Sequence, residues 1–138
     1  MIFIDTSAWY AVEVEDDVNH EAAHSFLKDI ASGKHGAAIT SDYVLDETLT
    51  LLRSRRNLTS AIDFIDKVRK SKSIKVFWID EALFEKALAI FRKSNRKTWS
   101  FTDCTSFTLM RDLSVSKAFT FDAHFKEAAF QTLPSHNR

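Results

Sequence analysis

The stretch AFTFDAHF (residues 118–125) is a run of apolar and strand-forming residues that ends on a carboxylate, Asp122. The N-terminal stretch MIFIDTS (residues 1–7) has the same form, because three large apolar residues are followed by Asp5. Consecutive apolar residues without alternation are typical of a strand that is buried on both faces. The carboxyl ends of parallel strands meet at one edge of their sheet, so the two aspartates are predicted to lie at the same edge.

The rest of the chain alternates between helical and strand patterns. Strands are predicted at residues 2–5, 36–40, 75–79 and 118–121, with 130–134 as a candidate edge strand. Helices are predicted at residues 19–32, 41–56, 59–71, 81–95 and 102–113, followed by a short last helix. Asp80 is expected to cap the fourth of these helices, and Thr102 the fifth. This alternation predicts an α/β fold with a mostly parallel sheet.

Length and composition predict one ordinary globular domain, residues 1–138. The chain is 45% hydrophobic and 28% charged, and no linker rich in Gly and Pro divides it. The first residues lack a basic segment and no apolar run approaches the roughly 20 residues of a membrane span, so neither a signal peptide nor a membrane contact is expected. The single cysteine, Cys104, allows no internal disulfide, which fits a reducing compartment and a cytoplasmic protein.

The net charge of zero hides an asymmetry between the two parts of the chain. Residues 1–50 hold 10 Asp and Glu against 2 Lys and Arg, a balance of −8, while residues 51–138 hold 9 against 17, a balance of +8. An acidic site beside a basic surface would suit metal ions and a phosphate-rich partner. Charged residues scattered over solvated faces of the protein would give the same difference in charge between the two parts of the chain.

Two further acids are placed to join Asp5 and Asp122. Asp103 falls in the first turn of its predicted helix, and Glu47 lies about two turns into the helix that follows residue 41. The helical neighbours of Glu47 place it toward the core: Tyr43, Val44 and Leu51. Each acid alone could simply cap a helix or start a turn. Four converging carboxylates, however, require raised pKa values or a bound cation.

The predicted cation is Mg²⁺ or Mn²⁺, because hard divalent ions prefer oxygen ligands. His20 and His24 are expected to be a helix surface pair and Cys104 a small buried residue, so a zinc site is not predicted. His124 could approach the acids or simply begin a helix. A divalent ion makes phosphodiester hydrolysis feasible without a nucleophilic side chain.

Four segments of the chain resemble the acidic blocks of PIN-domain ribonucleases, most closely the small VapC-type toxins of type II toxin–antitoxin systems. The segments are FIDTSAW, SDYVLDETLTLL, WSFTDCTSFTLMRDL and AFTFDAHF, and the resemblance extends from Ile2 to about Leu133. It implies a three-layer α/β/α sandwich, RNA cleavage that depends on Mg²⁺ or Mn²⁺, and frequent homodimers. In toxin members it also implies a cognate antitoxin that inserts a segment across the acidic cleft.

The resemblance also implies roles for individual residues. Asp5 and Asp103 would be the principal metal ligands, and Asp122 and Glu47 would complete the catalytic cluster directly or through water. Two threonines beside the aspartates could orient ligands or a phosphate: Thr6 and Thr120. The chain departs from the family at two turns, where many relatives have glycine and this chain has Ser114 and Ala129-Phe130.

A basic region is expected to bind the RNA through phosphate contacts and base stacking. Its members follow the Glu47 helix or precede the Asp103 helix: Arg53, Arg55, Arg56, Arg96, Lys97 and Trp99. Solvated helix ends would explain the same cations, and Trp99 could equally belong to the core.

The sequence therefore predicts a metal-dependent endoribonuclease that hydrolyses RNA phosphodiester bonds and acts as the toxin of a toxin–antitoxin pair. The alternative is a non-catalytic RNA- or protein-binding module that retains the fold. A phosphoacceptor domain of receiver type also clusters aspartates at strand ends, but no lysine of this chain follows a late strand in the required place.

Overall fold

The computed structural model of the protein describes residues 1–95 and 97–135. Five strands form one sheet in the order β3-β2-β1-β4-β5, and all four pairings between neighbours are parallel. The strands are β1 (Ile2–Ile4), β2 (Ala38–Ser41), β3 (Ile74–Phe77), β4 (Lys117–Phe119) and β5 (Gln131–Leu133). The helices of the described residues are α1 (Thr6–Glu13), α2 (His20–Ala31), α3 (Asp42–Arg55), α4 (Leu58–Lys70), α5 (Glu81–Lys93), α6 (Phe101–Asp112) and α7 (Ala123–Glu127).

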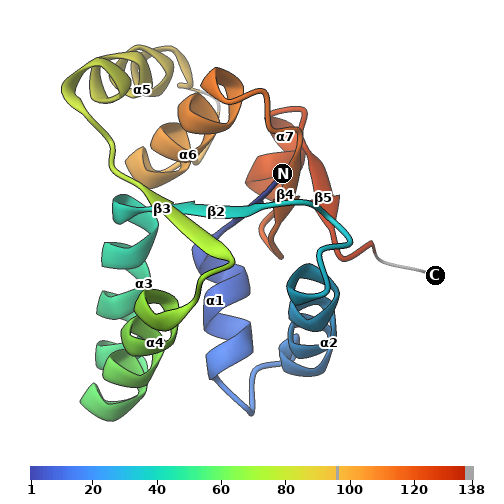
Figure 1. The fold of residues 1–138 in the computed structure, drawn as a ribbon. Coiled ribbons are helices and arrows are strands. Elements are labelled where there is room, and N and C mark those ends of the chain that lie inside the picture. Colours follow the sequence, from blue (N-terminus) through green and yellow to red (C-terminus); the bar gives the residue numbers. More distant parts are fainter. Residues whose placement is uncertain (96, 136–138) are drawn as a thin grey trace.

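The strand order places helices on both faces of the sheet. The chain moves outward from β1 through β2 to β3, then crosses to the other side of β1 to form β4 and β5. Because crossovers between parallel strands are right-handed, the two directions of travel put their helices on opposite faces. Figure 1 shows α1 to α4 on one side of the sheet and α5 to α7 on the other. The predicted three-layer α/β/α sandwich with a parallel sheet is confirmed.

The direction of travel reverses between β1 and β4, the two strands that Asp5 and Asp122 follow. After β1 the chain leaves toward β2 over one face, and after β4 it leaves toward β5 over the other. Ile4 pairs with Phe119, and the backbone N–H of Asp5 donates to the carbonyl of Phe119 at 3.0 Å. Ligand sites of open α/β sheets form at such a reversal, outside the carboxyl ends of the strands.

The central strand β1 is the most deeply buried part of the chain. Ile2, Phe3 and Ile4 have no exposed surface. Phe3 stacks on Phe125 of α7, with ring centroids 6.2 Å apart, and Phe125 in turn meets Phe107 of α6 edge to face at 5.0 Å. This aromatic layer fixes α6 and α7 over β1 and β4, and so fixes where their first turns lie.

The helix α1 was not among the predicted elements. No helix was expected between the first strand and residue 19, yet residues 6–13 form one. The side chain of Asp5 caps it by accepting from the backbone N–H of Ser7. The helix has only 8 residues, so its periodicity is difficult to recognise in the sequence.

The cap of α6 also differs from the prediction. Ser100, and not Thr102, is the N-cap, so Asp103 occupies the third helical position. The Ser100 hydroxyl accepts from the Asp103 N–H and the Asp103 carboxylate accepts from the Ser100 N–H, each at 3.0 Å, which is a capping box. The capping of α5 by Asp80 is confirmed, and the other elements differ from the predicted limits by a few residues at their ends.

The two turns at which the chain departs from the family keep a left-handed backbone without glycine. The φ angle is 55° at Ser114 and 70° at Ala129. Side chains with a Cβ atom are disfavoured in this region. At each turn a backbone hydrogen bond closes over the left-handed residue: Val115 N–H donates to the carbonyl of Met110 at 2.8 Å, and Phe130 N–H donates to that of Phe125 at 3.0 Å.

Candidate active site

All four predicted acids line one cleft of about 540 Å³ at the reversal between β1 and β4. They come from four places that are distant in sequence, and their neighbours in the cleft come mainly from α1 and α3. The lining residues are Asp5, Thr6, Ser7, Tyr10, Asp17, Asn19, Glu47, Leu51, Arg55, Asp103, Phe121, Asp122 and Ala123. The structure thus brings Asp5, Glu47, Asp103 and Asp122 to a common surface.

Asp5 is the most deeply buried of the four acids, with 3% of its surface exposed. Its Oδ2 atom accepts from the hydroxyl of Ser7 at 3.0 Å and from that of Thr120 at 3.0 Å. Burial raises the pKa of Asp5 to about 7, and the nearby charge of Asp103 adds to this effect, while the hydroxyl bonds oppose it. A carboxylate here is therefore held in place but is only half ionised near neutral pH.

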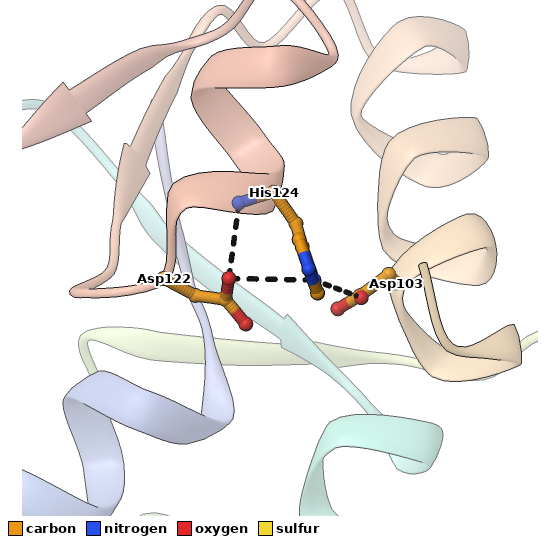
Figure 2. A group of neighbouring side chains, drawn as sticks. All are labelled: Asp103, Asp122 and His124. Atoms are coloured by element: carbon orange, nitrogen blue, oxygen red, sulfur yellow. Dashed lines mark hydrogen bonds and ion pairs between the residues drawn. The ribbon is translucent and has the colours of Figure 1, made fainter. Parts of the chain in front are cut away.

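Asp103 and Asp122 lie on either side of the His124 ring. The Nδ1 atom of His124 is 2.8 Å from Oδ2 of Asp103 and 3.3 Å from Oδ1 of Asp122 (Figure 2). Asp122 also caps α7, because its Oδ1 accepts from the backbone N–H of His124 at 3.0 Å. Burial raises the pKa of Asp103, although the bonds from Ser100 and His124 oppose the shift.

The three aspartates share one arrangement. Among the residues that the structure describes, each aspartate accepts its side-chain hydrogen bonds on a single oxygen: Oδ2 of Asp5, Oδ2 of Asp103 and Oδ1 of Asp122. The first oxygen anchors the side chain to its helix N-terminus and to its neighbours. The second oxygen of each carboxylate is then available to a ligand.

Glu47 completes the cluster from the second turn of α3 and is half-buried. Partial burial raises the pKa of Glu47, and the charges of Asp103 and Asp122 raise it further. Asp46, one residue earlier, is exposed and does not line the cleft. Burial is the largest cause of the raised pKa at all three carboxylates, and repulsion between the acids adds to it.

His124 is both a helix N-terminal residue and a member of the site. Burial opposes a charge on its ring, but the bond to Asp103 and the charges of Asp122 and Asp103 outweigh burial and raise the pKa of His124. Its Nε2 atom lies 3.1 Å from the hydroxyl of Thr98. The ligand atoms of Asp103, Asp122 and His124 lie within 4.8 Å of one another, so this trio could hold a metal ion.

Both predicted threonines lie beside an acid: Thr120 bonds Asp5, and the side chain of Thr6 opposes the rise in the pKa of Glu47. Thr6 is buried in the wall of the cleft, and its hydroxyl lies 3.5 Å from the carbonyl of Val44. Ser7 was not predicted, although it bonds Asp5 and accepts from the backbone N–H of Phe121 at 2.9 Å. The signal in the sequence was its position two residues after a capping aspartate.

The described members of the predicted RNA-binding set lie at the end of α3 and in the loop before α6. Of the three arginines at the end of α3, Arg55 lines the cleft, Arg56 pairs with Asp16 at 3.2 Å, and Arg53 is exposed. Of the loop residues, Lys97 is exposed and Arg96 lies outside the described residues.

Trp99 packs inward. Its ring meets that of Phe107 edge to face at 5.0 Å, and its Nε1–H donates to Glu127 at 3.0 Å. This matches the core alternative more than base stacking. Cys104 is fully buried, as predicted. The rings of His20 and His24 stack on the surface of α2, 5.9 Å apart.

Among the described residues, no helix is long and apolar enough to span a membrane.

A parallel α/β/α sandwich with four acids at its reversal point is the arrangement of a PIN domain. The sequence model of the PIN domain family matches residues 2–131, and the chain belongs to this family. Within the family it is similar to VapC ribonucleases. The 23S rRNA-specific endonuclease VapC20 of Mycobacterium tuberculosis is 34% identical over 130 residues, which cover 94% of this chain and 95% of that protein.

Two further comparisons agree. A VapC ribonuclease of Archaeoglobus fulgidus is 28% identical over 123 residues, covering 88% of this chain and 77% of that protein. The crystal structure of Mycobacterium tuberculosis VapC20, described as a Sarcin-Ricin loop cleaving toxin, superposes with a TM-score of 0.84 at 32% identity and covers 94% of this chain and 96% of that one. FitAcB from Neisseria gonorrhoeae, at 15% identity and a TM-score of 0.63, supports the fold alone.

Proposed function

We propose that this protein is a metal-dependent endoribonuclease and the toxin component of a toxin–antitoxin pair. The observation that carries the proposal is the convergence of Asp5, Glu47, Asp103 and Asp122 on one cleft, with raised pKa values at three of them. The similarity to VapC ribonucleases over nearly the whole chain supports it.

The donor set fits Mg²⁺ or Mn²⁺. The four acids offer oxygen ligands, which hard divalent ions prefer, and a cation would offset the burial and the repulsion that raise the pKa values of Asp5, Glu47 and Asp103. We assign Asp5 and Asp103 as the principal ligands, with Asp122 and Glu47 completing the site directly or through water. Such an ion supplies Lewis-acid activation of water and neutralises charge on the phosphate under attack.

The residues of the chain hold and orient these ligands. Ser7 and Thr120 fix the Asp5 carboxylate at Oδ2, and His124 holds Asp103 and Asp122 at a set spacing. Thr6 lines the wall of the cleft beside Glu47 and is assigned a ligand-orienting role with Thr120. Four preformed acidic ligands mean that no nucleophilic side chain is required for hydrolysis.

The proposed substrate is ribosomal RNA. VapC20 is named as a 23S rRNA-specific endonuclease and as a Sarcin-Ricin loop cleaving toxin. The likeness of this chain to VapC20, in sequence and in fold, makes 23S rRNA the first RNA to test. The cations predicted to bind RNA, Arg53, Arg55, Arg56, Arg96 and Lys97, together with Trp99, remain proposals.

We further propose that residues 1–138 act as one nuclease domain in the cytoplasm, as a homodimer that a cognate antitoxin inhibits. An antitoxin segment would be expected to cover the acidic cleft. Co-expression with the product of an adjacent small reading frame, followed by copurification, tests the partner. Light scattering on the purified chain tests the dimer.

Removal of divalent metal is expected to stop RNA cleavage. The purified protein should cut 23S rRNA with Mg²⁺ or Mn²⁺ present and should lose that activity in excess chelator, because the carboxylates alone cannot activate water. Gel analysis of the RNA, with mapping of the new ends, measures both results. Cleavage that persists in excess chelator would contradict the proposal. RNA or protein binding without cleavage under any metal condition would favour the alternative, a non-catalytic binding module.

Replacement of His124 by alanine is expected to weaken binding of Mn²⁺ by roughly 10-fold to 100-fold, because groups that hydrogen-bond metal ligands set their orientation. Titration of Mn²⁺ followed by electron paramagnetic resonance measures the affinity without reference to RNA. Thr98→Val is the matched variant, since it removes only the contact to Nε2 of His124; its effect should be smaller. Unchanged Mn²⁺ affinity in His124→Ala would mean that the bridge between Asp103 and Asp122 has no role in metal binding.

A further inference from the structure

We propose that the groove between α1 and α3 holds the RNA strand beyond the phosphate that is cut, with Tyr10 stacking on a base and Arg55 binding a neighbouring phosphate. This inference rests on the proposed nuclease function and assigns the course of the substrate through the same cleft. The occupant is a single-stranded segment of RNA.

The groove is the part of the cleft that α1 and α3 line, and on each helix the lining residues lie on one face. On α3, Glu47, Leu51 and Arg55 follow one another at intervals of four residues, and all three line the cleft. On α1, Thr6 and Tyr10 have the same spacing and face the same cleft. With a rise of 1.5 Å per residue, about 12 Å of helix separates Glu47 from Arg55. The cleft is therefore elongated, with the acidic cluster at one end.

The charges along the groove indicate a polyanion bound at two points. Among the described residues that line the cleft, Arg55 is the only Lys or Arg, and the other charged residues are acids. At the acidic end a phosphate can bind only through a cation. Arg55 can attract a phosphate directly. Its distance from Glu47 along α3 suits a second phosphate of the same RNA strand. A guanidinium group binds phosphate through two parallel hydrogen bonds.

Tyr10 supplies the surface on which a base can stack. The Arg55 guanidinium lies over one face of the Tyr10 ring, with Cζ 5.7 Å from the ring centre, so the two side chains form a cation–π pair in the cleft and a base would stack on the other face of the ring. Tyr10 and Leu51 are both partly buried, which holds their positions without removing them from the cleft surface. Aromatic rings beside basic groups bind single strands with little sequence preference, because every base has a stacking face.

The neighbouring arginines show that this is not a general property of a basic helix end. Arg56 is engaged by Asp16 through both carboxylate oxygens at 3.2 Å. Arg53 is exposed but does not line the cleft. Of the three arginines, Arg55 alone lines the cleft that holds the acidic cluster.

Binding of RNA without cleavage tests the proposal. A labelled single-stranded oligonucleotide with a backbone that resists hydrolysis is titrated in Mg²⁺, with fluorescence anisotropy as the readout, so that binding is measured independently of catalysis. We expect Arg55→Ala to weaken binding about tenfold and to reduce the slope of log affinity against log salt by about 0.7, the value for one phosphate contact on a single strand. Tyr10→Leu should also weaken binding about tenfold, whereas Tyr10→Phe should bind like the unchanged protein.

The charge-matched control is Arg69→Ala, because Arg69 is exposed on α4 and lies against Trp78, away from the cleft. This variant should change affinity less than twofold. Melting curves identify any loss of fold in Tyr10→Leu, and the charge reversal Arg55→Glu at an exposed position provides a second test that does not disturb packing. In active protein, Arg55→Ala should raise KM and leave kcat nearly unchanged.

Unchanged affinity and an unchanged salt slope in Arg55→Ala and Arg55→Glu would overturn the inference. So would variants that bind RNA normally and lose affinity only for a protein partner, which would assign the groove to that partner. If Arg55 and Tyr10 govern RNA binding but the protein cleaves no RNA in any metal, the groove assignment stands and the nuclease proposal fails.

Discussion

Replacing Asp5 with asparagine is expected to reduce RNA cleavage at least about a hundredfold to a thousandfold while the protein stays folded. Asparagine has nearly the same shape as aspartate, and its side-chain oxygen can still accept from Ser7 and Thr120. It lacks the negative charge that a divalent ion requires. Initial rates on 23S rRNA, with circular dichroism as a check of fold, measure the effect.

Asp46→Asn is the matched control for this variant. Asp46 is exposed on α3, one residue before Glu47, and does not line the cleft. The Asp46→Asn substitution removes the same charge as Asp5→Asn. We expect its rate of RNA cleavage to lie within about twofold of the unchanged protein, because the effect of exposed charges is small and screened by salt. Equal activity in Asp5→Asn and Asp46→Asn would refute the assignment of Asp5 as a metal ligand.

The sequence predicted the acidic cluster because its members follow from topology. Asp5 comes directly after β1 and Asp122 comes three residues after the end of β4, and parallel pairing of β1 with β4 is sufficient to place them at one edge. Asp103 and Glu47 were found from their positions in amphipathic helices. None of these inferences required knowledge of side-chain conformation.

The contacts that orient the acids could not be predicted in the same way. Thr120 and Asp5 are separated by 115 residues, and the bond between them depends on the side-chain rotamers at the ends of two different strands. The role of Ser7 became visible only with α1, whose short apolar sequence gave no clear period. The engagement of Arg56 by Asp16 likewise depends on the path of the loop after α1. Local sequence carries no information on such long-range contacts.

The stability of the metal-free protein is expected to fall as the pH rises from about 4 to about 7. Asp5 has a pKa of 3.8 in an unstructured chain and about 7 in the folded protein. Between these values the folded chain holds a proton that the unfolded chain has lost, so by linkage the free energy of unfolding decreases with increasing pH. The raised pKa values of Glu47 and Asp103 act in the same direction. Thermal melting in chelator across this range measures the decrease, which Asp5→Asn should make shallower.

Divalent metal is expected to counter this loss of stability and to do so most at high pH. A bound cation favours the ionised carboxylates, so saturating Mg²⁺ or Mn²⁺ should raise the melting temperature by several degrees at pH 8 and by much less at pH 5, where Asp5 is protonated. NaCl at matched ionic strength controls for screening. An equal metal-induced rise at both pH values, or an undiminished rise in Asp5→Asn, would show that the ion binds elsewhere. Calorimetry in two buffers of different ionisation enthalpy measures the protons that metal binding releases. It distinguishes binding at Asp5 from binding elsewhere, because only a site that includes Asp5 must displace the proton of Asp5 near neutral pH.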